Sequence, residues 1–161
     1  MAHMYGMSFE FIYEFLSGVH VYYLTRIPSP AIISQALQEV KPIIMIAVPL
    51  VIEKIIRKKV FPKIQYNKLR LLLNMPVINK NVRAKIREQV YQSFGGNLYE
   101  IIIGGAALNG EIENFLRMIE FPYTVGYGAT ECGPIICYRD WHTFAKGSCG
   151  QAARHQVVRI E

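Results

Sequence analysis

The sequence predicts an α/β fold in which a mostly parallel sheet is flanked by helices on both faces. Three segments, at residues 43–48, 98–103 and 123–125, have the composition of strands in a parallel sheet: the first two are expected to be buried strands, and the third is a short one. Segments with apolar residues at helical spacing separate these runs along the chain. Because strands that alternate with helices form βαβ units, the chain is expected to build one parallel sheet.

Composition limits the class of protein. The chain has 161 residues, of which 52% are hydrophobic and 19% are charged, so it is expected to fold as one domain with a real core. Its net charge of +6 allows nucleic acid, anionic lipid or an anionic substrate as a partner and selects none of them. Its cysteines, Cys132, Cys137 and Cys149, are odd in number and lack Cys-x-x-Cys spacing, which favours a reducing, intracellular compartment.

The first residues are apolar, but they do not have the pattern of a targeting segment. They lack a basic region, and Glu10, Glu14 and His20 interrupt the apolar run, so neither a signal peptide nor a membrane span fits. We therefore expect a cytoplasmic protein.

The first forty residues are expected to contain two helices and a strand. Residues 9–16 carry an apolar stripe at helical spacing, and Gly18 suits the position just after the helix end. Residues 19–24 are rich in Val and Tyr and predict a strand. Ser29 can cap the second helix, with Pro30 at its first position.

The middle of the chain continues the alternation. After the buried strand at residues 43–48, residues 51–60 predict an amphipathic helix with basic side chains in its last turns, where cations suit the helix dipole. Residues 61–76 are basic and apolar without a clean period. Asn81 can cap a further helix that stops at Gly95-Gly96.

The last third repeats the pattern. Asn109 can cap a helix over residues 111–119, which precedes the strand at residues 123–125. Residues 157–160 predict a final strand, and a loop containing Trp141-His142 lies between. We expect one sheet to contain four strands, which begin near Val19, Ile43, Leu98 and Tyr123.

A glycine-rich segment follows the strand at residues 123–125, and it reads Gly126-Tyr127-Gly128-Ala129-Thr130-Glu131. Its glycines are expected to end that strand in a turn, where backbone can approach a ligand closely, and a carboxylate is a preferred magnesium ligand. The spacing alone equally fits an ordinary strand and turn with a solvated glutamate. A second pair, Gly104-Gly105, also follows a strand, and ligands of parallel sheets bind beyond the carboxyl ends of strands. The two turns can therefore line one crevice.

Three motifs in this order resemble those of the adenylate-forming enzymes, the AMP-binding superfamily that includes acyl-CoA synthetases. Residues 126–131 resemble its Gly-Tyr-Gly-x-Thr-Glu signature. Residues 101–108 resemble the strand and Gly-Gly-Ala-x-Leu turn beside adenine, and residues 147–150 resemble a Gly-Ser-x-Gly turn. The sequences of segments 39–42 and 47–49 resemble stretches found in long-chain fatty-acid–CoA ligases. The resemblance implies that residues 1–161 form a partial AMP-binding domain, the central βαβ subdomain of a larger N-terminal domain, incomplete at both ends.

The resemblance also implies roles for single residues. Gly104, Gly105 and Ala106 would offer backbone to adenine, and the Tyr127 ring would pack on the base. Gly128 and Ala129 would border the acyl carbonyl. The Thr130 hydroxyl would bond a phosphate oxygen, and Glu131 would hold Mg²⁺. The nucleotide-binding set is thus Gly104, Gly105, Ala106, Gly126, Tyr127, Gly128, Ala129 and Thr130; the catalytic set is Thr130, Glu131 and His3.

The role of His3 has an open alternative. Met1-Ala2-His3 resembles the second half of a Pro-x-x-His segment that lines the acyl pocket of acyl-CoA synthetases. It fits equally well as a disordered terminal residue or a cloning scar.

The resemblance implies an ATP-dependent fatty acid–CoA ligase as the parent enzyme, with ATP, Mg²⁺ and coenzyme A as its cofactor and co-substrates. The sequence lacks the Ser/Thr/Gly-rich loop with a lysine, the Thr-Gly-Asp motif and the small C-terminal domain of the family. We therefore expect the chain alone to be inactive and to bind ATP weakly. An incomplete domain should also expose apolar area and self-associate.

The basic segments do not by themselves identify a binding partner. Lysines and arginines gather between residues 54 and 70 and again between residues 80 and 87. A solvated helix face explains them most simply, and a contact with a membrane surface is the next interpretation. Nucleic acid is not expected, because no aromatic residues interleave with the charges in a known binding motif. The alternative function is a non-catalytic α/β module that binds partners or an anionic surface through this basic face.

Overall fold

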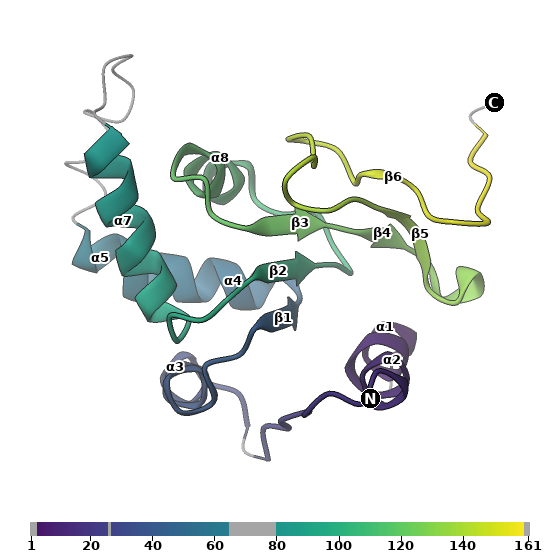
Figure 1. The fold of residues 1–161 in the computed structure, drawn as a ribbon, viewed down its shortest axis with the longest axis horizontal. Helices are drawn as coiled ribbons and strands as arrows, with labels where there is room; N and C mark the ends of the chain where they lie inside the picture. The colour runs from purple at the N-terminus through teal and green to yellow at the C-terminus, as the bar shows by residue number, and fades with distance from the viewer. Residues whose placement is uncertain (1–2, 26, 65–79, 160–161) are drawn as a thin grey trace.

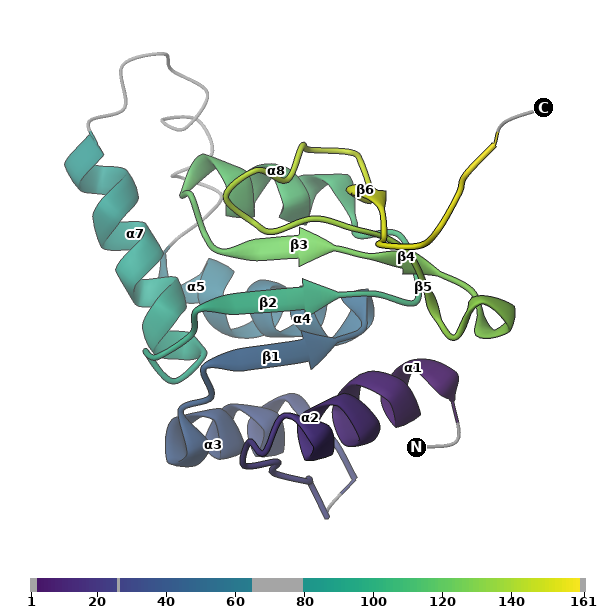
Figure 2. The same cartoon turned by 45° about the vertical axis from the view of Figure 1, so that its right-hand side comes forward.

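A computed structural model describes residues 3–25, 27–64 and 80–159. Figure 1 shows a sheet with helices packed around it, and a smaller sheet continues from it toward the C-terminus. The central sheet has three parallel strands in the order β1-β2-β3: β1 is Ile44–Ala47, β2 is Glu100–Ile103 and β3 is Tyr123–Val125. Their arrows point the same way in Figure 2. Three of the four predicted segments thus form a parallel sheet, without the strand expected near Val19.

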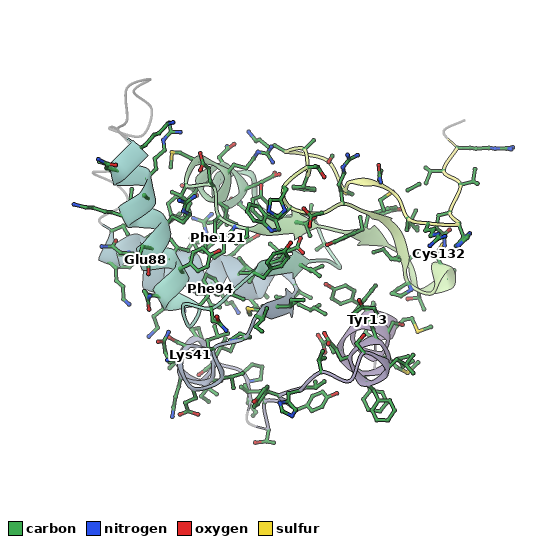
Figure 3. The ribbon with its side chains drawn as sticks, in the orientation of Figure 1. Tyr13, Lys41, Glu88, Phe94, Phe121 and Cys132 are labelled. Atoms are coloured by element: carbon green, nitrogen blue, oxygen red, sulfur yellow. The ribbon has the colours of Figure 1, made fainter. Side chains whose placement is uncertain are left out.

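One face of this sheet is covered by helices that follow β1 and β2. They are α4 (Pro49–Ile55), the π-helical η2 (Ile56–Val60), α5 (Phe61–Lys63) and α8 (Gly110–Met118), while α7 (Lys80–Ser93) lies at the end of the sheet where the strands begin (Figure 2). Their inward side chains join those of the strands in one core. Within this core, 5.7 Å separates the ring centroids of Phe94 and Phe121. Both residues are labelled in Figure 3. Each fully buried large apolar side chain contributes about 1.5–3 kcal/mol to folding.

The other face is only partly covered. A continuous helical segment lies there, made of α1 (Met4–Met7), η1 (Ser8–Ile12) and α2 (Tyr13–Leu16). The ring of Tyr5 packs against Gly104, and its hydroxyl donates to the Ile102 carbonyl at 3.5 Å. Ile44 of the edge strand remains half exposed. Helices therefore lie on both faces, and the predicted fold class is confirmed.

The surface of this N-terminal helical segment is apolar. Phe15 and Leu16 are 74% and 78% exposed, and the Phe11 and Phe15 rings stack with 6.1 Å between their centroids. Exposed apolar area of this kind is what the predicted self-association requires. Self-association stays a prediction.

A smaller antiparallel sheet follows the central one. Its strands are β4 (Tyr127–Gly128), β5 (Ile135–Tyr138) and β6 (Gln151–Ala152). β4 and β5 form a hairpin, with the short 3₁₀ helix η3 (Thr130–Cys132) at its tip. This hairpin was not predicted, and it carries the signature segment.

Several helix ends follow the predicted caps, although the cap predicted at Asn81 is wrong. The Ser29 hydroxyl accepts a hydrogen bond from the Ile32 amide, and Pro30 begins α3 (Pro30–Val40). Gly95 and Gly96, after α7, adopt φ of +97° and +76°, which favour glycine. A Cβ on Gly95 would also lie 2.3 Å from the Leu37 carbonyl oxygen, so no larger residue fits where α7 ends beside α3.

Three predictions about elements were wrong. Residues 19–24 do not form a strand, and their side chains are exposed. Val and Tyr favour strands because their side chains pack well on a sheet, and none of the described strands pairs with this segment. Residues 157–159 are likewise not in a strand, and residue 160 lies outside the described residues. Asn81 is inside α7, which already begins at Lys80. Of the segment 61–76, residues 65–76 lie outside the described residues.

Replacing Asn109 with alanine should destabilise α8 by about 1 kcal/mol. The Asn109 side chain accepts hydrogen bonds from the amides of Glu111 (3.0 Å) and Ile112 (3.4 Å), two groups that α8 itself leaves unsatisfied. Serine at this position should restore most of the loss, because its hydroxyl can accept the same bonds. Chemical denaturation of the three proteins measures the difference, and equal midpoints would show that the cap contributes nothing.

Candidate nucleotide-binding site

The two glycine turns lie side by side at the carboxyl edge of the central sheet. Gly104 directly follows β2 and Gly126 directly follows β3. The Gly126 amide donates to the Ile103 carbonyl at 2.8 Å, and the Gly104 amide donates to the Ala47 carbonyl at 3.1 Å. These bonds extend the strand pairing past the ends of all three strands, so both turns face the same edge.

The first turn presents backbone to solvent. Gly105 has φ of +85° and is exposed, as is Ala106. Gly104 is buried, and a Cβ there would lie 2.8 Å from the Tyr5 ring. The Tyr5 ring, which the sequence did not single out, therefore lies where a side chain at position 104 would be.

The signature was predicted to end β3 in a turn, but the chain does not turn directly after β3. Tyr127 and Gly128 continue as β4, where Gly128 pairs with Ile135 of β5. The turn comes later: the Ala129 amide donates to the Pro134 carbonyl at 2.9 Å and closes the hairpin tip. A Cβ on Gly128 would lie 1.9 Å from that Pro134 oxygen. Glycine is thus needed at 128 because the hairpin strands approach closely.

The hairpin places the two polar groups of the signature at its tip. Thr130 and Glu131 begin the 3₁₀ helix η3 and are both exposed, and the Cys132 that follows them lies at the same tip in Figure 3. Among the ion pairs and side-chain hydrogen bonds of the described residues, none involves the Glu131 carboxylate. The Tyr127 ring is 54% exposed on β4. A phenol ring, a hydroxyl and a carboxylate are therefore accessible beside the glycine turns.

The donor set suits one kind of metal site. Within the described parts of the chain, no three His, Cys, Asp or Glu side chains gather into a preformed metal cage. Magnesium is commonly held by one or two carboxylates together with the phosphates of a substrate. A single exposed carboxylate beside the glycine turns fits that arrangement and does not fit a structural metal site.

His3 lies at the start of α1. Its Nδ1 accepts a hydrogen bond from the Tyr5 amide at 3.2 Å, so its side chain caps the helix. Because Tyr5 packs on Gly104, this helix is held next to the first glycine turn. His3 itself is exposed, and its assignment to the site stays a prediction.

A buried glutamate, Glu113, holds the third motif, the turn at residues 147–150, in place. The Glu113 carboxylate on α8 accepts hydrogen bonds from the Gly147 amide at 2.9 Å and from the Tyr123 hydroxyl at 3.4 Å. It thereby attaches the turn at residues 147–150 to the strand that leads into the signature. A clue was present in the sequence, because Glu113 follows an inward-facing Ile112 on an amphipathic helix.

The basic helices are largely solvated. Arg57 pairs with Glu111 at 2.9 Å and Arg87 pairs with Glu120 at 3.2 Å. Lys54 is exposed, and Lys68 and Arg70, which belong to the basic segment between residues 54 and 70, lie outside the described residues. None of the described helices has the length and apolar character needed to cross a bilayer. Contact with a membrane surface stays a prediction.

Comparison with known proteins agrees with the motifs. Residues 1–161 match the family described as "AMP-binding enzyme". Long-chain-fatty-acid–CoA ligase 4 of Saccharomyces cerevisiae is 26% identical over 93% of the chain and 23% of its own length. Long-chain-fatty-acid–CoA ligase 2 of Schizosaccharomyces pombe is 28% identical over 90% of the chain and 24% of its own length. The chain thus spans about a quarter of the length of these relatives.

A solved structure shares the fold. A benzoate CoA ligase from Burkholderia xenovorans LB400 superposes with a TM-score of 0.63 at 18% identity, over 94% of this chain and 25% of that one. The paired glycine turns and exposed signature carboxylate therefore occur on a fold known from a CoA ligase. Since the family match covers the whole sequence, the chain belongs to the AMP-binding enzyme family.

Proposed function

We propose that this chain is part of an ATP-dependent long-chain fatty acid–CoA ligase and forms part of its nucleotide-binding site. The observation that carries the proposal is the hydrogen bond from the Gly126 amide to the Ile103 carbonyl, which joins the two glycine turns at one edge of the sheet. The names of the curated relatives support a long-chain fatty acid as the substrate.

The proposed reaction has two steps. In the first, a carboxylate oxygen of the fatty acid attacks the α-phosphorus of ATP, the bond to pyrophosphate breaks, and an acyl-adenylate forms. In the second, the thiol of coenzyme A attacks the acyl carbonyl carbon, loses its proton, and displaces AMP. Negative charge is concentrated on the phosphates in the first step, so groups that neutralise it lower the barrier.

The adenosine side of the site consists of backbone and one ring. Gly105 and Ala106 are exposed next to β2, where a flat base can approach the main chain without meeting a long side chain. We assign Gly104 to the same turn, although its missing side chain makes room for Tyr5. The exposed Tyr127 ring is suited to pack on the base.

The phosphate side consists of the hairpin tip. The Thr130 hydroxyl would donate to a phosphate oxygen, and Glu131 would hold Mg²⁺. Bound there, magnesium would neutralise phosphate charge and orient the α-phosphate. Gly128 and Ala129 lie between this tip and β3, where we place the acyl carbonyl; the capped helix after His3 would border the acyl chain.

The test is acid-dependent exchange of pyrophosphate into ATP by the complete enzyme, with palmitate and benzoate as alternative acids. We expect exchange with palmitate and little with benzoate. Exchange with benzoate alone would keep the family and overturn the long-chain acid. No exchange with either acid, together with binding to anionic vesicles, would favour a non-catalytic module that binds through its basic face.

A further inference from the structure

A buried carboxylate lies on the central sheet, away from the glycine turns. Glu100 is the first residue of β2 and is 4% exposed. Its Oε2 accepts a hydrogen bond from the Tyr138 hydroxyl at 3.1 Å, whereas its Oε1 is buried with no hydrogen-bond partner among the described residues. Burying a carboxylate is costly, so one that is retained with incomplete bonding calls for an explanation.

Tyr138 joins three parts of the structure. It is the last residue of β5 and pairs with Gln151 of β6. The turn that ends at Gly150 lies against its main chain, since a Cβ on Gly150 would be 2.4 Å from the Tyr138 carbonyl carbon. Through its hydroxyl, Tyr138 reaches Glu100 on the central sheet. The Glu100 contact therefore attaches the small sheet to the large one.

A second attachment lies next to the first. The Thr124 hydroxyl on β3, which is completely buried, donates to the Arg139 carbonyl at 2.7 Å. The Arg139 side chain in turn donates to Thr143 at 2.9 Å and to Gln151 at 2.8 Å. The end of β5 is thus fixed to both β2 and β3.

The other end of β5 carries the signature. Ile135 of β5 pairs with Gly128, and the tip between them holds Thr130 and Glu131. Among the described residues, the backbone hydrogen bonds of the tip are internal to the hairpin, such as those from Ala129 to Pro134 and from Cys132 to Ala129. The position of the tip relative to the central sheet therefore depends on β4, which continues β3, and on the attachments of β5.

The groups that face Glu100 determine its charge. Burial raises the pKa of Glu100, the hydrogen bond from Tyr138 lowers it, Asp140 raises it, and the Trp141 amide and His142 lower it. Asp140 is itself paired with His142, whose Nδ1 lies 2.6 Å from Oδ1. The net direction is upward, so Glu100 loses its charge at a higher pH than an ordinary glutamate.

We propose that Glu100 is a positioning residue for the adenylate-forming site, and that its bond to Tyr138 holds β5 so that the hairpin presents Thr130 and Glu131 correctly. The inference rests on the proposed function. Glu100 touches neither nucleotide nor acid; it acts through Tyr138 and the hairpin.

The test compares Glu100→Ala and Tyr138→Phe in the complete enzyme. Each should slow acid-dependent pyrophosphate exchange about tenfold, the effect of losing one hydrogen bond to a charged group. Each should also raise the Mg²⁺ concentration needed for half-maximal rate, because a displaced hairpin holds Glu131 less well. The double variant should be no slower than either single one, since both changes remove the same bond.

Glu100→Gln separates positioning from general destabilisation. Its amide oxygen can still accept from Tyr138, so this variant should be faster than Glu100→Ala. Val90→Ala on α7, where Val90 is completely buried, is the stability control: it should lower stability without changing the Mg²⁺ dependence.

The outcomes distinguish the two proposals. If the wild-type enzyme exchanges pyrophosphate and Tyr138→Phe has the same exchange rate and the same Mg²⁺ dependence, the positioning role is overturned. The proposed function would remain intact. Tyr138→Phe keeps the ring and decides the question even if Glu100→Ala does not fold. A wild-type enzyme that performs no exchange with any acid overturns the proposed function, and the positioning role with it.

Discussion

Replacing Glu131 with glutamine in the complete enzyme is expected to slow adenylate formation at least about a hundredfold, equal to about 3 kcal/mol of barrier. Glutamine keeps the shape of the side chain and removes the charge that balances a bound cation. Because Glu131 is exposed at the hairpin tip, the same change should alter stability by no more than about 0.5 kcal/mol. Loss of rate without loss of stability is the expected signature of a metal ligand.

The measurement is pyrophosphate exchange at several Mg²⁺ concentrations, alongside thermal unfolding. Glu88→Gln is a matched control, since Glu88 is an exposed glutamate on α7, distant from the hairpin in Figure 3. The control should keep the wild-type rate. If Glu131→Gln also exchanges at nearly the wild-type rate, Glu131 is not a metal ligand and the phosphate side of the site must be reassigned.

The central sheet was predictable because the strands of a parallel sheet are apolar along most of their length. Such runs coincide with β1, β2 and β3, and the caps at Ser29 and Asn109 located the helix before β1 and the helix between β2 and β3. The wrongly predicted strand at residues 19–24 shows the limit of this reasoning. Val and Tyr are favoured in strands only where a neighbouring strand is available, and pairing is not visible in a local stretch of sequence.

The site was predictable in part. That Gly104 and Gly126 follow neighbouring strands was deducible, because carboxyl ends of parallel strands share an edge. The hairpin was not deducible, since β4 has only two residues and its pairing with β5 is set by long-range contacts. The packing of Tyr5 against Gly104 likewise joins residues that are far apart in the chain, so only the structure reveals it.

The buried carboxylates illustrate the same limit. Glu100 interrupts an otherwise apolar run, and a sequence pattern can count it only as an exception. Its partner Tyr138 belongs to a different sheet. An exception in a buried strand is therefore a place to look for a polar contact between elements, but its partner has to come from the fold.

Gly128→Ala should abolish adenylate formation and disrupt the hairpin. A Cβ at 128 would lie 1.9 Å from the Pro134 oxygen, 2.9 Å from the Pro134 carbonyl carbon and 3.2 Å from the Ile135 Cα. All three atoms are backbone, so relief requires separating β4 from β5 and breaking the Ala129–Pro134 bond that closes the tip. Overpacking of this kind costs about 1–3 kcal/mol.

Hydrogen exchange of the Ala129 amide tests this explanation without any substrate. In the wild type that amide is bonded to the Pro134 carbonyl, and in Gly128→Ala it should exchange faster, by a factor of about ten to a hundred if about 1.4–2.8 kcal/mol of local stability is lost. Gly110→Ala is the matched control, because a Cβ there meets nothing within 4 Å and lies in a helix, where alanine is favoured. If exchange at Ala129 is unchanged while activity is lost, Gly128 serves the acyl substrate directly, and the close approach of β4 and β5 is not what requires glycine.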